Sequence, residues 1–287
     1  MRILNITRDP LKKTCKYPVV ILVLFLFFAP HMFGQGNLLL YPKRLVFEGT
    51  QNRVQLLNLT NTGKDSATYR ISYVEVKMTG DGQREYLKEP EEGQRFATPF
   101  LRVFPRTVTI APNRSQQIKI QLIKTSSLEP GEYRSHLYLR AVPKDKKREK
   151  KNETDTENTG LSISLTPVFG YTIANIIKIG EPDIQVELSD IAVEISKKNI
   201  PELSFNINRK GNMSPYGDFN VWHISPKGEE TIVGSIKGIS VYVPGTYRKL
   251  RIKLNNPKKI NFYEGELRIV YASSAGKTIY SETSFKL

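Results

Sequence analysis

Few residues of this chain have the types and spacing that catalysis or metal binding needs. The three histidines, His31, His136 and His223, lie far apart in the sequence, and Cys15 is the single cysteine. Each histidine is expected to have a structural or surface role, because none has a second ligand or a base nearby in the sequence. No spacing singles out a pair of carboxylates for general acid–base catalysis, and there is no glycine-rich phosphate loop. We therefore expect a protein that is not an enzyme and that uses no cofactor and no metal.

Positive charge is the strongest chemical bias of the sequence. The formal net charge is +15, and the chain after residue 36 still carries 38 basic and 27 acidic residues. Such a balance suits an anionic partner or surface, although a solvated basic surface has the same composition. There is no arginine-rich helix, zinc-ligand spacing or basic strand studded with aromatics, so no nucleic acid partner is expected. The mixed-charge stretch 144–158 is expected to be a solvated loop, or a loop that orders on contact with a partner.

The first 36 residues have the three-part pattern of a secretory signal peptide. A basic start at 11–16 precedes an unbroken apolar run at 19–29, and small residues follow at 34–36. The apolar run is shorter than the about 20 residues that a membrane-spanning helix needs. An uncleaved anchor is the alternative. We expect cleavage, secretion and a mature chain without cysteine.

Short alternating runs separated by turn residues make up the chain from residue 37 onward. Strands have a side-chain period of two, and several short strands at regular spacing predict an all-β sandwich. Within one such strand, 129–143, His136 is expected on the outward face. A glycine and a proline in 178–182 mark a boundary, after which the pattern restarts. We predict an all-β fold of two β-sandwich domains, 37–180 and 181–287, after the signal peptide 1–36.

The segment 161–173 predicts the longest alternating strand. Its odd positions are almost wholly apolar, and its even positions are small or polar. At about 3.3 Å per residue this row would exceed the usual strand length of about 17–20 Å, so part of it is expected to extend beyond its own core. An apolar edge strand is an aggregation hazard unless it pairs with another chain. The alternative is an ordinary core strand that bends at Pro167 and Gly170.

Several stretches together resemble the periplasmic chaperones of fimbria and pilus assembly, the PapD-like family. Each motif is modest, but their order and spacing cover essentially the whole chain after the signal peptide. The stretches are YPKRLVFEG (41–49), NLTNTGKDSATYRIS (58–72), PRTVTIAPNRSQQIKIQL (105–122), EPGEYRSHLYLRAVP (129–143), SLTPVFGYTIANIIKIG (164–180), RKGNMSPYGDFNVW (209–222) and KGISVYVPGTYRKLRIKL (237–254).

The resemblance implies two immunoglobulin-like sandwiches around an interdomain cleft, and a partner that lacks one strand. In this family the closing strand of the first domain fills the gap in a pilus subunit, which is donor-strand complementation. The donor-strand residues that the resemblance implies here are Ile163, Leu165, Phe169, Tyr171 and Ile173.

The family also holds the C-terminal carboxylate of the subunit with two basic residues in the cleft. Arg44 matches the first of them, and a guanidinium suits the task because its planar fork meets both carboxylate oxygens. The chain departs from the family pattern at the second, because 169–174 contains no lysine. Lys178 is the nearest base and is the candidate, with a place in the interdomain linker as the alternative.

The sequence therefore predicts a periplasmic chaperone that caps pilus, fimbrial or related surface-appendage subunits through residues 161–173. An outer-membrane usher is a further partner that the sequence leaves open, and no small-molecule substrate is expected. The alternative is a secreted two-domain adhesive or cell-surface binding module with no subunit client.

Overall fold

The first β-sandwich is formed by two sheets, one of four and one of six strands. The computed structural model describes residues 38–143, 167–195, 200–255 and 260–287, so the expected signal peptide lies outside the described residues. The four-stranded sheet has the order β1-β3-β8-β6, and the other has the order β2-β10-β9-β4-β5 with β7 also paired to β4. The strands are β1 (Leu38–Tyr41), β2 (Arg44–Glu48), β3 (Val54–Asn61), β4 (Ala67–Met78), β5 (Arg84–Leu87), β6 (Leu101–Phe104), β7 (Thr107–Ile110), β8 (Ser115–Leu122), β9 (Gly131–Val142) and β10 (Gly170–Ile179).

The second β-sandwich consists of a three-stranded and a four-stranded sheet. Their orders are β11-β12-β15 and β14-β13-β16-β17, and all pairs are antiparallel. The strands are β11 (Ile184–Ile195), β12 (Pro201–Gly211), β13 (Tyr216–Ile224), β14 (Glu230–Ser240), β15 (Tyr247–Lys253), β16 (Glu266–Ser273) and β17 (Ile279–Lys286).

Each sandwich has its own hydrophobic core, built from the inward side chains of alternating strands. The first core is mainly aliphatic, with Leu57 and Ile120 among its fully buried members, and it also contains Phe47. The second core contains a stack of Phe219 on Tyr271, whose ring centroids are 4.2 Å apart. These two cores confirm the predicted all-β fold with two immunoglobulin-like sandwiches. The limits 37–180 and 181–287 stay predictions.

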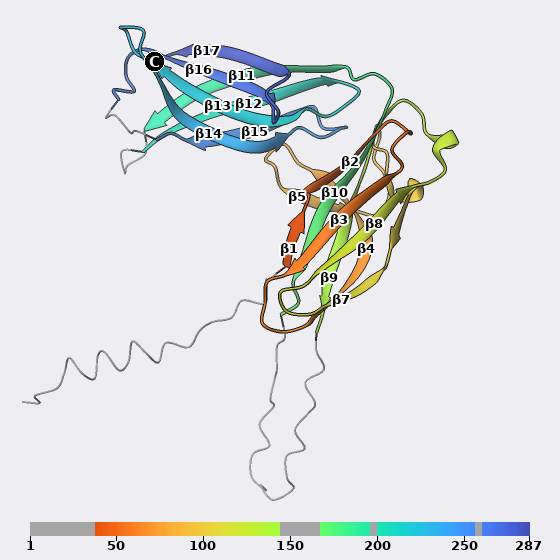
Figure 1. Ribbon diagram of the computed structural model, residues 1–287. Coiled ribbons are helices and arrows are strands. Elements are labelled where there is room, and N and C mark those ends of the chain that lie inside the picture. Colours follow the sequence, from red (N-terminus) through yellow and green to blue (C-terminus); the bar gives the residue numbers. More distant parts are fainter. Residues whose placement is uncertain (1–37, 144–166, 196–199, 256–259) are drawn as a thin grey trace, which may run out of the picture. The chain divides into compact units, whose positions relative to one another are not determined.

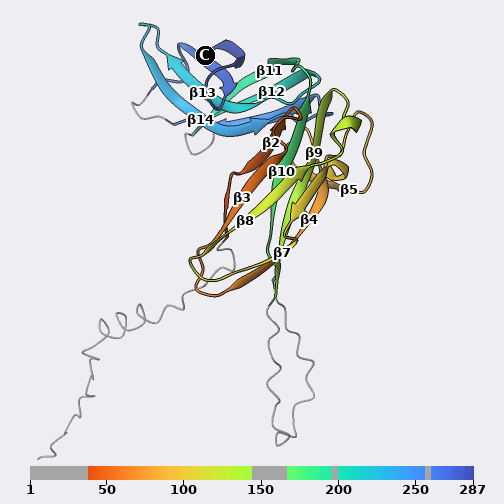
Figure 2. The same cartoon turned by 45° about the vertical axis from the view of Figure 1, so that its right-hand side comes forward.

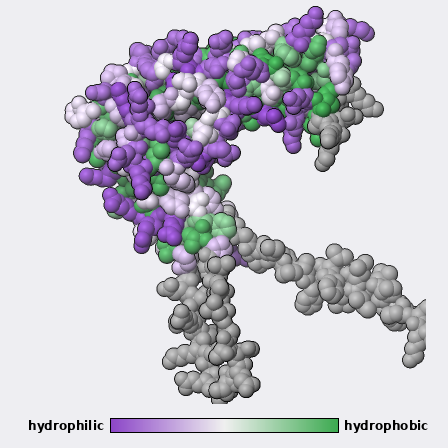
Figure 3. All heavy atoms as spheres, turned by 180° about the vertical axis from the view of Figure 1, so that it is seen from behind, coloured by the Kyte–Doolittle hydropathy of each residue, from purple (hydrophilic) through white to green (hydrophobic). Residues whose placement is uncertain are grey.

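The helical segments that the structure describes are two short 3-10 turns, η1 (Thr98–Phe100) and η2 (Thr125–Ser127). Among the described residues, no helix has the length and apolar character needed to cross a membrane. Hydrophilic residues predominate on the face of the molecule seen in Figure 3, with hydrophobic residues gathered at a few places between them.

The first strand segment changes sheets, and this change positions the candidate site. β1 pairs with β3 in the four-stranded sheet, whereas β2 pairs with β10 in the other. Pro42 and Lys43 connect the two segments, and a proline cannot continue a ladder because it has no backbone N–H. Figures 1 and 2 show β2, β10 and β9 in one sheet, in the order in which they are hydrogen-bonded.

Candidate functional site

Strand β10 has two neighbours along its second half and one along its first half. β9 pairs with all of β10, from Gly170 to Ile179. β2 runs parallel to β10 and pairs only with 174–178, because it begins at Arg44 opposite Ala174. Among the described residues, no strand pairs with 170–173 on the side away from β9. The first half of β10 is therefore an open sheet edge.

The hydrogen bonds of β10 alternate between its two sides. Phe169 O accepts a bond from Ala141 N–H on the β9 side at 3.0 Å, and Lys178 O accepts from Gly49 N–H on the β2 side at 2.8 Å. In a β-strand, the N–H and C=O groups of one residue point to the same side of the strand, and those of the next residue point to the other side. Gly170 and Thr172 therefore direct their backbone groups toward the open edge.

The predicted strand 161–173 coincides with β10 only at 170–173. The stretch 167–169 belongs to no strand, so the strand prediction was wrong there, and 161–166, with Ile163 and Leu165, lies outside the described residues. Phe169 is 42% exposed, and Tyr171 is half-buried against the first core.

Ile173 needs a correction, because it is only 3% exposed and belongs to the core of its own sandwich. The reason is the pleat of β10. The pleat turns the odd positions of the strand toward the core of the sandwich, and Ile177 continues the same buried row. Ile173 is therefore already buried and has no surface to offer to another chain.

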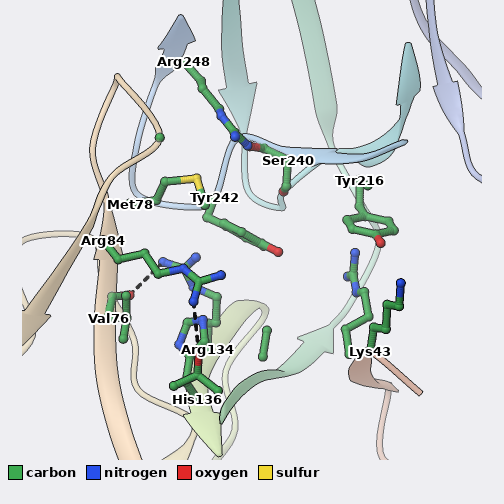
Figure 4. Close-up of a pocket in the computed structure, with 15 residues that line it drawn as sticks. Lys43, Val76, Met78, Arg84, Arg134, His136, Tyr216, Ser240, Tyr242 and Arg248 are labelled. Atoms are coloured by element: carbon green, nitrogen blue, oxygen red, sulfur yellow. Dashed lines mark hydrogen bonds between the residues drawn. The ribbon is translucent and has the colours of Figure 1, made fainter. Parts of the chain in front are cut away.

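A pocket of about 300 Å³ lies on the outer face of this sheet, at the row where β2 begins (Figure 4). In that row Arg44, Ala174 and His136 are adjacent on β2, β10 and β9. The second sandwich supplies the other wall, through β13, β14, β15 and the turn between the last two. The residues that line the pocket are Lys43, Arg44, Val76, Met78, Gly82, Arg84, Arg134, His136, Thr172, Ala174, Tyr216, Gly238, Ser240, Tyr242 and Arg248.

Two tyrosines of the second sandwich cover two arginines of the first. The Arg44 guanidinium carbon is 3.7 Å from the centre of the Tyr216 ring, and that of Arg134 is 4.1 Å from the centre of the Tyr242 ring. A guanidinium over an aromatic face is attracted by the ring quadrupole, and the ring excludes water. The predicted site residue Arg44 is thus held in the pocket, with its side-chain plane fixed by stacking.

Several nitrogens of these side chains are buried without a hydrogen-bond partner among the described residues. They include Nε and Nη1 of Arg44, Nε of Arg134, Nε of Arg248 and Nδ1 of His136. Burying an unpaired cation is costly, because water no longer solvates it. Arg134 is only 6% exposed, and burial lowers the pKa of its guanidinium.

His136 lies on the outer face of its sheet, as expected, but it is buried there, with an exposure of only 8%. The second sandwich supplies the opposite wall of the pocket that His136 lines, and a single strand pattern cannot reveal this cover. Burial, together with the charges of Arg134 and Arg84, lowers the pKa of His136 to about 3. The imidazole is therefore neutral at pH 7.

Lys178 does not line the pocket. Its ammonium is 3.9 Å from Glu48 Oε1, the carboxylate opposite it on β2, and it is four residues beyond Ala174 along β10. The structure therefore brings Arg44 together with Lys43, Arg84, Arg134 and Arg248, and leaves Lys178 with a partner of its own.

Sequence reasoning missed most of the basic residues in this pocket. Arg134 and His136 are two residues apart on a predicted strand, so their shared face was a usable signal. Arg84 comes from the strand after the β4–β5 turn and Arg248 from the second sandwich, and no local pattern connects them. Within the described residues, no group of three or more histidine, cysteine, aspartate or glutamate side chains could hold a metal ion.

Buried hydrogen bonds connect the two sandwiches beside the pocket. The Glu132 carboxylate accepts from Ser214 N–H at 2.8 Å and from Ser214 Oγ–H at 2.6 Å, and Glu132 is only 4% exposed. Ser214 Oγ in turn accepts from Val243 N–H at 2.9 Å. On the other side, Lys249 N–H donates to Gly80 O at 2.7 Å. These bonds join the elements that form the two walls of the pocket.

Comparisons with known proteins give fold matches but no sequence match. No family model and no curated protein matches the chain. Over most of its length it is similar to solved structures of periplasmic pilus chaperones. The class 5 fimbriae chaperone CfaA is 15% identical, with 87% of this chain and 98% of that chain covered and a TM-score of 0.44. The Pseudomonas aeruginosa chaperone CupB2 is also 15% identical, with 87% and 100% covered and a TM-score of 0.43. The Salmonella enterica chaperone SafB, solved in complex with the pilin SafA, is 12% identical, with 89% of this chain and 98% of that chain covered and a TM-score of 0.43.

Proposed function

We propose that this protein is a non-enzymatic periplasmic chaperone that caps incomplete subunits of a surface appendage by adding its own strand to their sheet. The observation that carries the proposal is the open edge of β10 at 170–173, next to the stretch 174–178 of the same strand, which pairs with both β2 and β9. An extended chain that pairs with such an edge gains backbone hydrogen bonds, and pockets for alternate side chains give specificity.

The side chains that the strand offers to a partner are those N-terminal to Ile173. Phe169 is partly exposed, and Val168 beside it is 37% exposed. Together with the sequence positions Ile163 and Leu165, Phe169 forms the row that we assign to the subunit, with Tyr171 at its inner end. Burial of one large apolar side chain contributes roughly 1.5–3 kcal/mol, so three or four of them would provide most of the gross binding free energy.

The start of β2 determines where an added strand must stop. A partner strand parallel to β10 and in line with β2 would run along 170–173 and meet Arg44 at its C-terminal end. We therefore assign the terminal carboxylate of the subunit to Arg44, where Nε and Nη1 are buried without a partner. A planar guanidinium can bind both oxygens of a carboxylate. The neighbouring Lys43, rather than Lys178, is the second base in this proposal.

A pair of substitutions at residue 172 tests the strand edge directly. Thr172→Pro removes the backbone N–H that faces the open edge, and proline is tolerated at sheet edges. Thr172→Val keeps that N–H and serves as the matched control. We expect a subunit that co-purifies from the cell envelope with wild type and Thr172→Val to be absent with Thr172→Pro, while the circular dichroism spectra of all three agree.

Side-chain substitutions provide a second, independent arm. Phe169→Asp and Ile163→Asp place a charge in the proposed apolar row and are expected to abolish co-purification without unfolding the protein. Equal recovery of the same subunit with Thr172→Pro, Phe169→Asp and wild type would overturn the proposal.

A further inference from the structure

The pocket beside the open edge carries more positive charge than one carboxylate can neutralise. Its lining includes five basic side chains and the neutral His136, and none of the 15 lining residues is acidic. Glu132 and Glu75 act electrostatically on Arg134 from outside the lining, but their hydrogen bonds come from Ser214 and from Thr98 and Ser135. The lining itself therefore favours an anionic ligand.

Four of the five basic side chains form two groups on opposite sides of the pocket, and Arg248 lies apart from both beside Ser240. Figure 4 shows Arg84, Arg134 and His136 on one side, with Lys43 on the other below Tyr216. Arg44, which stacks on Tyr216, belongs to the second group. Arg134 donates to Val76 O at 3.3 Å and Arg84 to Thr172 Oγ1 at 3.0 Å, so neither has a carboxylate as a hydrogen-bond partner. Two separate groups of donors suit a ligand with two separate anionic groups.

The position of the pocket connects it to a polypeptide end. Thr172 and Ala174 belong both to β10 and to the pocket lining, so a strand added along 170–173 would deliver its last residues into the pocket. A free small dianion would use the same donors but would gain nothing from the strand edge.

We propose that the pocket selects subunits with an acidic C-terminal end, whose α-carboxylate binds Arg44 and whose Asp or Glu side chain, among the last residues, binds Arg84 and Arg134. This inference rests on the proposed function, because the strand edge delivers the chain end. It adds a preference for acidic termini that strand addition alone does not require.

Peptide binding to the intact protein tests this preference. The probes are two 12-residue peptides of alternating valine and threonine that end in Glu-Ala or Gln-Ala, each with a free or an amidated C-terminus. We expect the free Glu-Ala peptide to bind about tenfold more tightly than the free Gln-Ala peptide, as for one added charge-assisted hydrogen-bonded pair. Amidation should weaken both peptides by a similar factor, because it removes the group assigned to Arg44.

Variants assign the effect to the proposed side chains. Arg84→Gln is exposed at the surface and should leave the fold intact, so it is the main variant, and Arg134→Lys is the second. Both should reduce the advantage of Glu-Ala over Gln-Ala to less than about threefold. Lys119→Gln, an exposed position on the other sheet, is the charge-matched control and should change nothing.

The outcomes separate the two proposals. Equal affinity for the free Glu-Ala and Gln-Ala peptides, lost in Thr172→Pro, would overturn the acidic preference and leave the proposed function standing. Peptide affinities that Thr172→Pro does not change, or no peptide binding at all, would count against both. Glutarate or inorganic phosphate that displaces the Glu-Ala peptide at equal concentration would identify a site for small dianions and would overturn the inference.

Discussion

The two halves of β10 differ in what surrounds them, although they form one continuous strand. In the second half, 174–178, the strand pairs with both β2 and β9, and Ile176 and Ile177 are fully buried. In the first half, 170–173, one edge is open, and the chain just before it exposes Val168 and Phe169. The difference shows that one strand can complete its own fold at one end and remain available for pairing at the other.

The largest expected effect is a difference in the free energy of unfolding between a substitution in the second half of β10 and one just before its first half. Ile177→Ala removes a fully buried side chain from the first core and should lower the free energy of unfolding by about 3 kcal/mol. Phe169→Ala should cost less than about 1 kcal/mol, since the side chain is partly exposed. Urea denaturation of both variants measures the contrast. Similar losses would mean that both halves belong equally to the core.

The junction between the halves should respond to pH through His136. The folded protein holds the pKa of this histidine at about 3, whereas the unfolded chain protonates it near its ordinary value of about 6.5. Below pH 6.5 the unfolded chain binds a proton at His136 that the folded protein does not bind. The free energy of unfolding therefore falls as the pH is lowered from 6.5 toward 3. Between pH 6.5 and pH 5 the loss should be about 2 kcal/mol.

A His136→Gln variant is the reference for this pH effect. Its free energy of unfolding should fall less than that of wild type over the same interval, so the difference between the two proteins isolates the histidine. Glu75, whose pKa is raised chiefly by burial, changes stability in the opposite direction and is present in both proteins. Parallel curves for wild type and His136→Gln would contradict the assignment.

A buried hydrogen bond next to the paired half should also affect stability. Ser214→Ala removes an Oγ–H donor from the Glu132 carboxylate and an acceptor from Val243 N–H. Glu132 lies opposite Lys178 on the paired half, and a buried group that loses its partner costs about 1–3 kcal/mol. Thermal unfolding of Ser214→Ala beside Ser214→Thr, which keeps the hydroxyl, measures this loss.

The smallest effect is expected at the open half. Thr172→Val removes the acceptor of the exposed bond from Arg84, and an exposed hydrogen bond contributes little because water replaces it. The free energy of unfolding should change by less than about 0.5 kcal/mol. A loss as large as that of Ser214→Ala would show that the open edge is part of the stable core.

Local sequence patterns predicted the positions of the strands well, but they did not predict which strands pair with one another. The alternation in 129–143, and the last part of that in 161–173, correctly implied strands, because a period of two follows from the backbone of one segment. The parallel pairing of Arg44 with Ala174 depends on where the first strand changes sheets, and no residue of β10 encodes that point. The sequence also extended the donor row to Ile173, although the pleat turns this side chain into the core of its own sandwich.

Only part of the pocket could be predicted, because most of its basic residues come from segments that are far apart in the sequence. Arg44 was found through a motif near one strand, and the structure places it in the pocket. The other basic residues come from different hairpins and from the second sandwich, which also supplies the cover over the outward-facing His136. Lys178 was chosen as the base nearest in sequence, but the pleat and register place it beside Glu48 instead.

The change of sheet at Pro42–Lys43 has a consequence for which chains can be recognised at all. Since β2 occupies the edge of β10 from Ala174 onward, a partner strand that pairs with 170–173 could extend for only a few residues before it reached β2. A loop in the middle of a polypeptide has to continue past that point, whereas a finished terminus does not. In the proposed function, the change of sheet between β1 and β2 would therefore favour binding of chain termini over internal segments of equal hydrophobicity.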